Sequence, residues 1–154
     1  MRPPYISRGC FGCGTENDHS LGLRPRIEGE KLVAELTIPA RYRGFSRVVH
    51  GGISTALLDE IMGMAVGCVV EGRMATARVE VDFVRPVLVE TPLRVEGWYA
   101  GTDGRVHLGE SRLLGPDGTE LSRGRGRFVP LEERHAQAFM SRPLGDGSGG
   151  AGAG

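Results

Sequence analysis

The chain has 154 residues, of which 40% are hydrophobic, and this is enough for one compact domain. Nineteen Lys and Arg balance nineteen Asp and Glu, so no net charge favours a nucleic acid or an anionic membrane as partner. No apolar run reaches the roughly 20 residues of a membrane span, the start lacks a secretory signal, and three cysteines predict no disulfide framework. We therefore expect a cytoplasmic protein.

Residues 1–30 are rich in Gly, Pro, Asn and Asp, and predict an irregular segment packed on the domain. Cys10 and Cys13 have the spacing of half a zinc site, with His19 nearby. A closed structural zinc site needs four ligands, and no second pair follows. We therefore expect no metal and no cofactor.

Alternating hydrophobicity predicts a strand over Lys31–Ile38, and Pro39 ends it. From Gly51 to about Val70 the apolar residues cover nearly every side of a helix, which predicts a buried helix. Four further segments alternate, at residues 75–86, 91–100, 105–114 and 119–129, and predict a four-stranded antiparallel meander. Together these elements predict an α+β domain over 31–130, a curved antiparallel sheet wrapped around one long central helix, known as the hotdog fold.

The last of these strands has glycines at alternate positions, Gly124 and Gly126, between three arginines. A face of bare backbone predicts the close approach of another element, most simply the buried helix. The other face carries Arg123, Arg125 and Arg127. Residues 131–154 form a C-terminal extension with a short helix-like stretch, and its Gly-rich end predicts disorder from about residue 143.

The buried helix begins at His50-Gly51-Gly52, and its first N–H groups suit a developing oxyanion, although the same tripeptide also serves as a plain turn. Asp59 and Glu60 interrupt its apolar run, and the helix contains no Lys or Arg to pair with them. An unpaired carboxylate is costly to bury, so its presence here indicates either a nearby ligand or a contact with another subunit. The helical twist separates the two acids by about 100°. We choose Asp59, with Glu60 as the fallback acid.

The histidine of "HGG" followed by an acid nine positions later, together with the segment "CFGCGTENDHSLGL", resembles the hotdog-fold acyl-CoA thioesterases of the phenylacetate-pathway (PaaI-like) type. The resemblance covers residues 9–130. It implies hydrolysis of an acyl-CoA or related pantetheine thioester, and a homodimer or a dimer of dimers. A serine hydrolase is not expected, because the chain has no Gly-x-Ser-x-Gly elbow.

The resemblance also implies a role for each matching residue. The family's acid falls on Asp59, as general base or nucleophile, and its carbonyl-polarising N–H falls on Gly51 or Gly52. His50 would order the thioester, and the hydroxyl of Thr76 would assist the hydrolytic water. One departure is Gly44, which stands where many members have an assisting Asn.

Two alternatives stay open at the level of the sequence. The chain could be a non-catalytic acyl-CoA or lipid-binding hotdog protein that keeps Asp59 for packing. The three arginines, Arg125 foremost, would meet coenzyme A phosphates or form a solvated face. Asp59 lies roughly 10 Å along the helix from Gly52, so the sequence predicts a site shared between two antiparallel copies of the helix.

Overall fold

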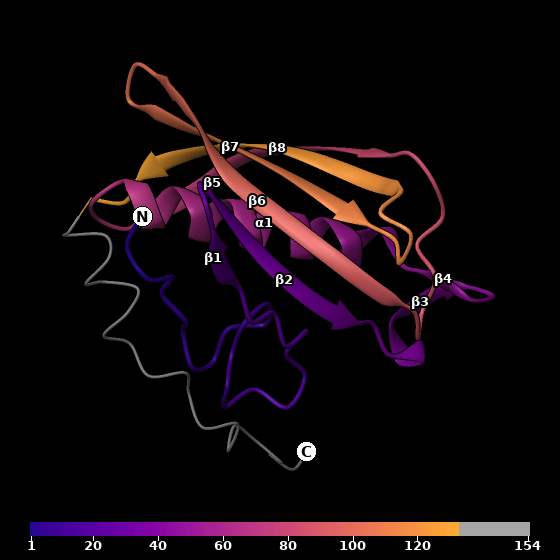
Figure 1. Cartoon of the computed structure of the whole chain (residues 1–154). Coiled ribbons are helices and arrows are strands. Elements are labelled where there is room, and N and C mark those ends of the chain that lie inside the picture. Colours follow the sequence, from indigo (N-terminus) through magenta and orange to yellow (C-terminus); the bar gives the residue numbers. More distant parts are fainter. Residues whose placement is uncertain (133–154) are drawn as a thin grey trace, which may run out of the picture.

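The computed structural model describes residues 1–132 as one α+β domain, in which a curved sheet wraps around a single long helix (Figure 1). Its elements are β1 (Arg26–Glu28), β2 (Lys31–Thr37), the 3-10 turn η1 (Ala40–Tyr42), β3 (Arg43–Phe45), β4 (Val48–Val49), α1 (Gly51–Val69), β5 (Met74–Phe83), β6 (Pro92–Asp103), β7 (Val106–Leu114) and β8 (Glu120–Pro130). This is the expected hotdog fold. The helix-like stretch and the Gly-rich end of the C-terminal extension lie outside the described residues.

The main sheet has six antiparallel strands in the order β1-β2-β6-β7-β8-β5. β6, β7 and β8 form a meander, but β5 pairs with β8 at the far edge and β2 takes the place beside β6. The expectation of a four-stranded meander was therefore wrong for its first strand. Residues 84–91 connect β5 to β6 without a tight turn, and they cross the end of α1 instead, where Val49 N–H donates to Val87 O at 2.8 Å. Alternation predicts a strand but does not identify its neighbour.

α1 runs along the concave side of the sheet and supplies much of the core, with Leu57, Leu58 and Ile61 fully buried. By length and composition alone it would be long and apolar enough to cross a membrane, with a mean hydropathy of 1.4. The sequence analysis did not predict this, because it looked for an uninterrupted apolar run and not for a high mean hydropathy. Half of this apolar stretch is buried within the chain itself, as is usual for a core helix.

Three glycines let the sheet come close to α1, as the alternating glycines of the last strand predicted. A Cβ on Gly124 would lie 3.3 Å from Leu58 Cβ, and one on Gly126 would lie 3.2 Å from Met62 Cε. A Cβ on Gly97 of β6 would lie only 2.8 Å from the carbonyl oxygen of Ile61. At Gly97 the sheet therefore meets the helix backbone directly, whereas at Gly124 and Gly126 it meets side chains that include Leu58 and Met62 of the helix.

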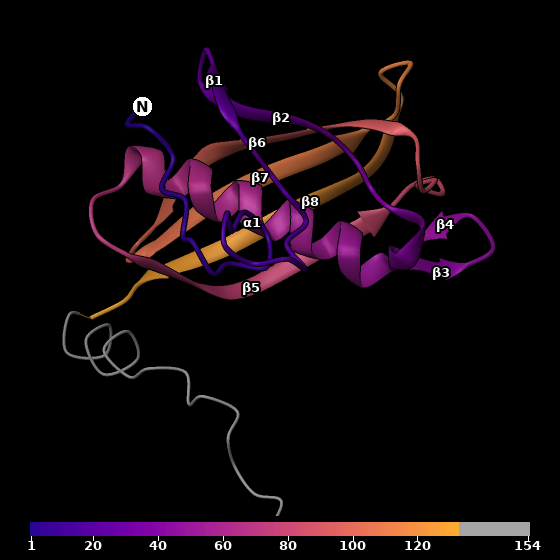
Figure 2. The same cartoon turned by 90° about the horizontal axis from the view of Figure 1, so that it is seen from below.

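The N-terminal segment crosses the face of α1 that the sheet leaves open (Figure 2). Leu21 and Leu23 anchor it in the main core cluster. The guanidinium of Arg24 donates to the carbonyl oxygens of Cys13 (2.7 Å) and Gly14 (3.2 Å), which holds the turn around Cys13 in place. Apart from β1, the segment has no regular structure before residue 30.

The outer face of the sheet carries an ion network centred on Glu96, which is only 5% exposed. Its carboxylate accepts from Lys31 at 3.2 Å, Arg94 at 2.9 Å and Arg112 at 2.9 Å. Burial alone would raise the pKa of Glu96, but these three donors outweigh it and hold the pKa at about 2. Trp98 lies on this face too, with Lys31 Nζ 5.0 Å from its ring.

The two edges of the sheet differ in length and in protection. β1 has three residues, two of them charged, and ends one edge. β5 has ten residues and ends the other, and among residues 1–132 its free side pairs with no strand. Phe83, at the end of β5, is 58% exposed. Proteins usually shorten, charge or cover a long strand edge, and one way to cover it is pairing with another chain.

Candidate functional site

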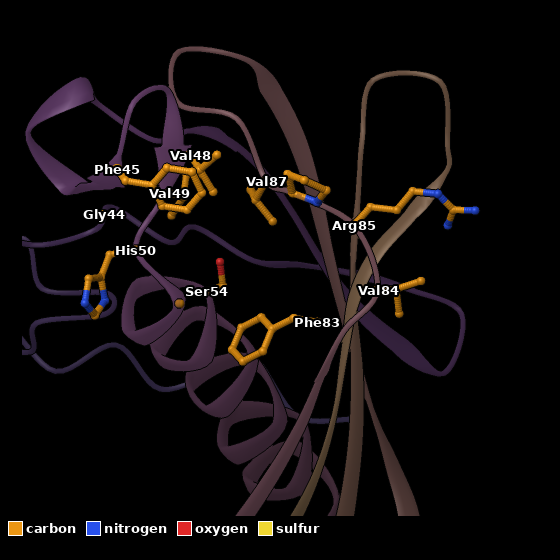
Figure 3. A pocket seen from close by; sticks show the side chains of 12 residues that line it. Gly44, Phe45, Val48, Val49, His50, Ser54, Phe83, Val84, Arg85 and Val87 are labelled. Carbon is orange, nitrogen blue, oxygen red and sulfur yellow. The ribbon is translucent and has the colours of Figure 1, made fainter.

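A pocket of about 470 Å³ opens at the N-terminal end of α1, between the helix, the β3–β4 hairpin and the segment that follows β5 (Figure 3). Its lining is mostly apolar, and consists of Gly44, Phe45, Val48, Val49, His50, Gly51, Ser54, Phe83, Val84, Arg85, Pro86 and Val87. Apolar walls with a few polar groups are typical of a small-molecule site. The pocket thus joins two of the residues singled out from the sequence, His50 and Gly51.

His50 caps α1 through its own ring, because Nδ1 accepts the N–H of Gly52 at 2.9 Å. That N–H is therefore occupied. The N–H of Gly51 makes no hydrogen bond to any other described residue, and Gly51 lines the pocket. Between the two donors that the sequence left open, the geometry favours Gly51.

There is little room for a side chain at Gly51. A Cβ on Gly51 would lie 3.3 Å from the ring of Phe83, which points toward the first turn of the helix in Figure 3. Any larger residue would narrow the approach to the free N–H. A glycine at this position therefore suits a backbone donor that a substrate must reach.

Asp59 lies two turns further along α1, partly buried, where its Oδ1 accepts from the hydroxyl of Thr76 at 3.1 Å. Burial raises the pKa of Asp59, the Thr76 hydrogen bond lowers it, and the negative charge of Glu60 raises it further. The structure thus brings together the expected acid and the expected hydroxyl. Thr55 does not assist them, because its hydroxyl donates to Gly51 O at 2.9 Å.

Within one chain, the acid and the pocket are separate. Asp59 and Thr76 are absent from the pocket lining, and Asp59 comes seven residues after Gly52 along the helix, a rise of roughly 10 Å. The side chains that face Asp59 along the helix are small, with Thr55 one turn before it and Gly63 one turn after. The space beside Gly63 is taken by the Phe128 ring of the same chain, whose Cε1 would lie 3.3 Å from a Cβ at that position.

Glu60, the fallback acid, points away from Asp59 and toward the N-terminal segment. Its Oε1 lies 3.3 Å from Cys10 Sγ, and a Cβ on Gly12 would lie 2.6 Å from its Cδ. Its carboxylate thus already has partners in the same chain. This position favours Asp59 over Glu60 as the acid available to a ligand.

The three arginines of β8 lie on the outer face of the sheet, away from the pocket and exposed. Arg123 Nε pairs with Asp82 at 2.9 Å, and Arg127 pairs with Asp103 at 2.9 Å. Arg125 makes no hydrogen bond or ion pair among the residues that the structure describes, although its charge helps to lower the pKa of Asp82. Arg125 thus differs from Arg123 and Arg127, because its guanidinium is not used in an ion pair within the described residues.

Sequence reasoning missed Ser54, which is 1% exposed and whose hydroxyl points into the pocket in Figure 3. Its position one helical turn after His50 was the available signal, because residues four apart share a helix face. Two large side chains do not line the pocket, because Met62 is in the core and Trp98 is on the outer face of the sheet.

The region around the site is similar to a known protein family. Residues 47–113, less than half of the chain, match a family model described as the thioesterase superfamily. No curated protein matches the chain. The matched region holds His50, Gly51, Asp59 and Thr76.

The fold is shared with several solved structures. A thioesterase superfamily protein is 26% identical over 80% of this chain, with a TM-score of 0.76, and this chain covers 64% of that one. The PaaI protein of E. coli, from the phenylacetic acid degradation operon, is 17% identical, with coverages of 77% and 88% and a TM-score of 0.67. A mutant thioesterase from Pseudomonas aeruginosa is 23% identical, with coverages of 72% and 84% and a TM-score of 0.64.

Proposed function

Because residues 47–113 match the thioesterase superfamily and the chain has the hotdog fold of solved thioesterases, we propose that this protein hydrolyses an acyl thioester of coenzyme A or a related pantetheine carrier to the free acid and thiol. The observation that carries this proposal is that one helix holds both a free backbone donor and a candidate catalytic acid. α1 presents an unoccupied N–H at the mouth of an apolar pocket, and it also carries a partly buried carboxylate of raised pKa.

In this mechanism the acyl group lies in the pocket, with its carbonyl oxygen on the N–H of Gly51. The positive end of the helix dipole and this N–H stabilise the oxyanion that forms when the carbonyl is attacked. Asp59 acts either as general base on a water or as nucleophile, and the hydroxyl of Thr76 holds it in place. His50 keeps the helix entrance in shape through its bond to Gly52 N–H.

The roughly 10 Å between Asp59 and the helix N-terminus supports a site completed by a second copy of the chain. In a twofold dimer with antiparallel helices, Asp59 of one chain approaches Gly51 of the other. The long free edge of β5 and its exposed Phe83 offer a surface for such pairing. We propose a homodimer on these grounds, with a dimer of dimers as its further assembly.

We propose that coenzyme A phosphates meet Arg125, the β8 arginine whose guanidinium is free within residues 1–132. Arg125→Ala should then raise KM several-fold while leaving kcat unchanged. Arg123→Ala is the matched control on the same face, since its side chain is already paired with Asp82. Equal KM values for both variants would assign the arginines to a solvated face.

The test of the activity is a panel of short, medium and aromatic acyl-CoAs, followed by release of free thiol. We expect at least one to be hydrolysed well above the buffer rate, and Asp59→Asn to abolish the release. The competing function is a binding protein that does not consume its ligand. It would show as an acyl-CoA that raises the Tm of the wild-type protein and is recovered intact.

A further inference from the structure

Two thiols and a carboxylate gather where the N-terminal segment crosses α1. One potential ligand atom from each of Cys10, Cys13 and Glu60 lies within 4.8 Å of the others. Cys10 Sγ is 3.3 Å from Glu60 Oε1, and Cys13 is only 2% exposed. Glu60 follows the cysteines by about fifty residues, so the chain must fold before the three side chains meet.

The turn that carries the cysteines is shaped before any ligand arrives. The N–H of Gly12 donates to Cys10 Sγ at 3.2 Å, and the N–H of Gly14 donates to Cys10 O at 2.8 Å. The bond from Gly12 fixes the position of the Cys10 sulfur within the turn. Arg24 fixes the far side of the turn through its bonds to carbonyl oxygens.

The cluster lacks a counter-charge. No Lys or Arg side chain pairs with Cys10, Cys13 or Glu60 in the described part of the chain. A bound cation would supply the missing charge.

We propose that Cys10, Cys13 and Glu60 bind one zinc-type divalent ion that fastens the N-terminal segment to α1. Two thiolates with one carboxylate suit Zn²⁺ and are poor ligands for Mg²⁺ or Ca²⁺. Zn–S bonds of about 2.3 Å at tetrahedral angles place ligand atoms slightly under 4 Å apart, so small side-chain movements suffice. These three ligands fall one short of the four of a closed structural site, the count that argued against zinc in the sequence, and a water would complete the coordination.

This site is separate from the proposed reaction. Asp59 and Glu60 are neighbours on α1, but their side chains point about 100° apart around the helix. The ion would therefore hold the N-terminal segment against α1 at Glu60. It would take no part in the attack on a thioester. Its loss would loosen the N-terminal segment from the helix.

The test uses the full chain, purified under reducing conditions without chelators. We expect elemental analysis to find about one zinc per chain, and replacement by Co²⁺ to give a thiolate-to-cobalt charge-transfer band with strong visible bands of a tetrahedral centre. Cys10→Ser and Cys13→Ser should abolish both signals. Glu60→Gln should weaken metal affinity by at least about tenfold, because even changes to groups behind the ligands cost 10- to 100-fold.

Cys68→Ser is the matched control, since Cys68 is a buried thiol of α1 outside the cluster, and it should retain metal in full. Adding a chelator to wild-type protein should lower its Tm, which gives a readout even if a serine variant fails to fold. Three results would overturn the proposal: no metal and no cobalt band while the thiols are free, a Cys10–Cys13 disulfide in the unreduced protein, or full metal content in folded Cys13→Ser.

Discussion

The placement of Asp59 carries a cost to stability, and the proposed function would give that cost a purpose. It sits in the helix that forms the core, and one hydroxyl, that of Thr76, is its hydrogen-bond partner. Burial disfavours its charged form, and Glu60 adds repulsion. A carboxylate that is ionised only with difficulty is a stronger base when it does ionise, which is the property that hydrolysis needs.

Asp59→Asn should therefore remove activity and increase stability. We expect kcat to fall by about 10²- to 10⁴-fold, the usual contribution of a general base. Because the folded-state pKa of Asp59 is raised, stability is lost as the pH rises through that pKa, and Asn avoids this loss. Urea unfolding should show the variant more stable at neutral pH and the difference vanishing in acid. A less stable variant at neutral pH would show that the carboxylate is needed for packing.

Glu96 is the opposite case, a carboxylate whose charge stabilises the fold. Its pKa is lowered from 4.5 to about 2, so its contribution is present above the ordinary value and is lost as the pH falls toward about 2. We expect Glu96→Gln to cost about 1–3 kcal/mol at neutral pH, since it leaves three donors with a weaker acceptor. The two proteins should unfold alike in strong acid. A constant difference at every pH would assign the loss to shape and not to charge.

At the scale of elements, the helix and strands could be read from the sequence because their signals are local. The all-round apolar pattern predicted α1, and the alternation of Gly124 and Gly126 predicted the close contact with it. The place of β5 in the sheet could not be read, because both edges accept an alternating strand equally well. The contact between Glu60 and Cys10 could not be predicted either, because the two residues are far apart in the sequence. A helical wheel shows which face of α1 carries Glu60 but not which segment packs on that face.

The contact between β6 and α1 allows a sharp test of this packing. Gly97→Ala would place a methyl group 2.8 Å from the carbonyl oxygen of Ile61, which belongs to the helix backbone and has no rotamer to change. We expect a loss of about 1–3 kcal/mol in the free energy of unfolding. Gly67→Ala is the control, since its Cβ meets no atom within 4 Å and alanine favours helix by up to about 1 kcal/mol. Equal stability of the two variants would contradict the close approach at Gly97.

At the scale of the whole molecule, the separation of Asp59 from the pocket leads to a prediction about mixed dimers. His50→Ala and Asp59→Asn should each be nearly inactive. Refolded together in equal amounts, they should recover about a quarter of the wild-type sites, because about half of the dimers are mixed and each has one intact site. Sedimentation of tagged chains checks that mixed dimers form. If they form and remain inactive, the acid and the N–H donor act within one chain.

The free edge of β5 has a further consequence for the life of the newly made chain. Its sequence, Met74–Phe83, contains no proline, and the charges of Arg78, Glu80 and Asp82 together with a bulge near Thr76 are what discourage the edge from recruiting other strands. In the proposed homodimer an identical chain covers this edge, and before that pairing the edge and the exposed Phe83 are open to other extended segments. Dimer formation would then compete with misassembly, so a variant that weakens the dimer should aggregate more readily as well as lose activity.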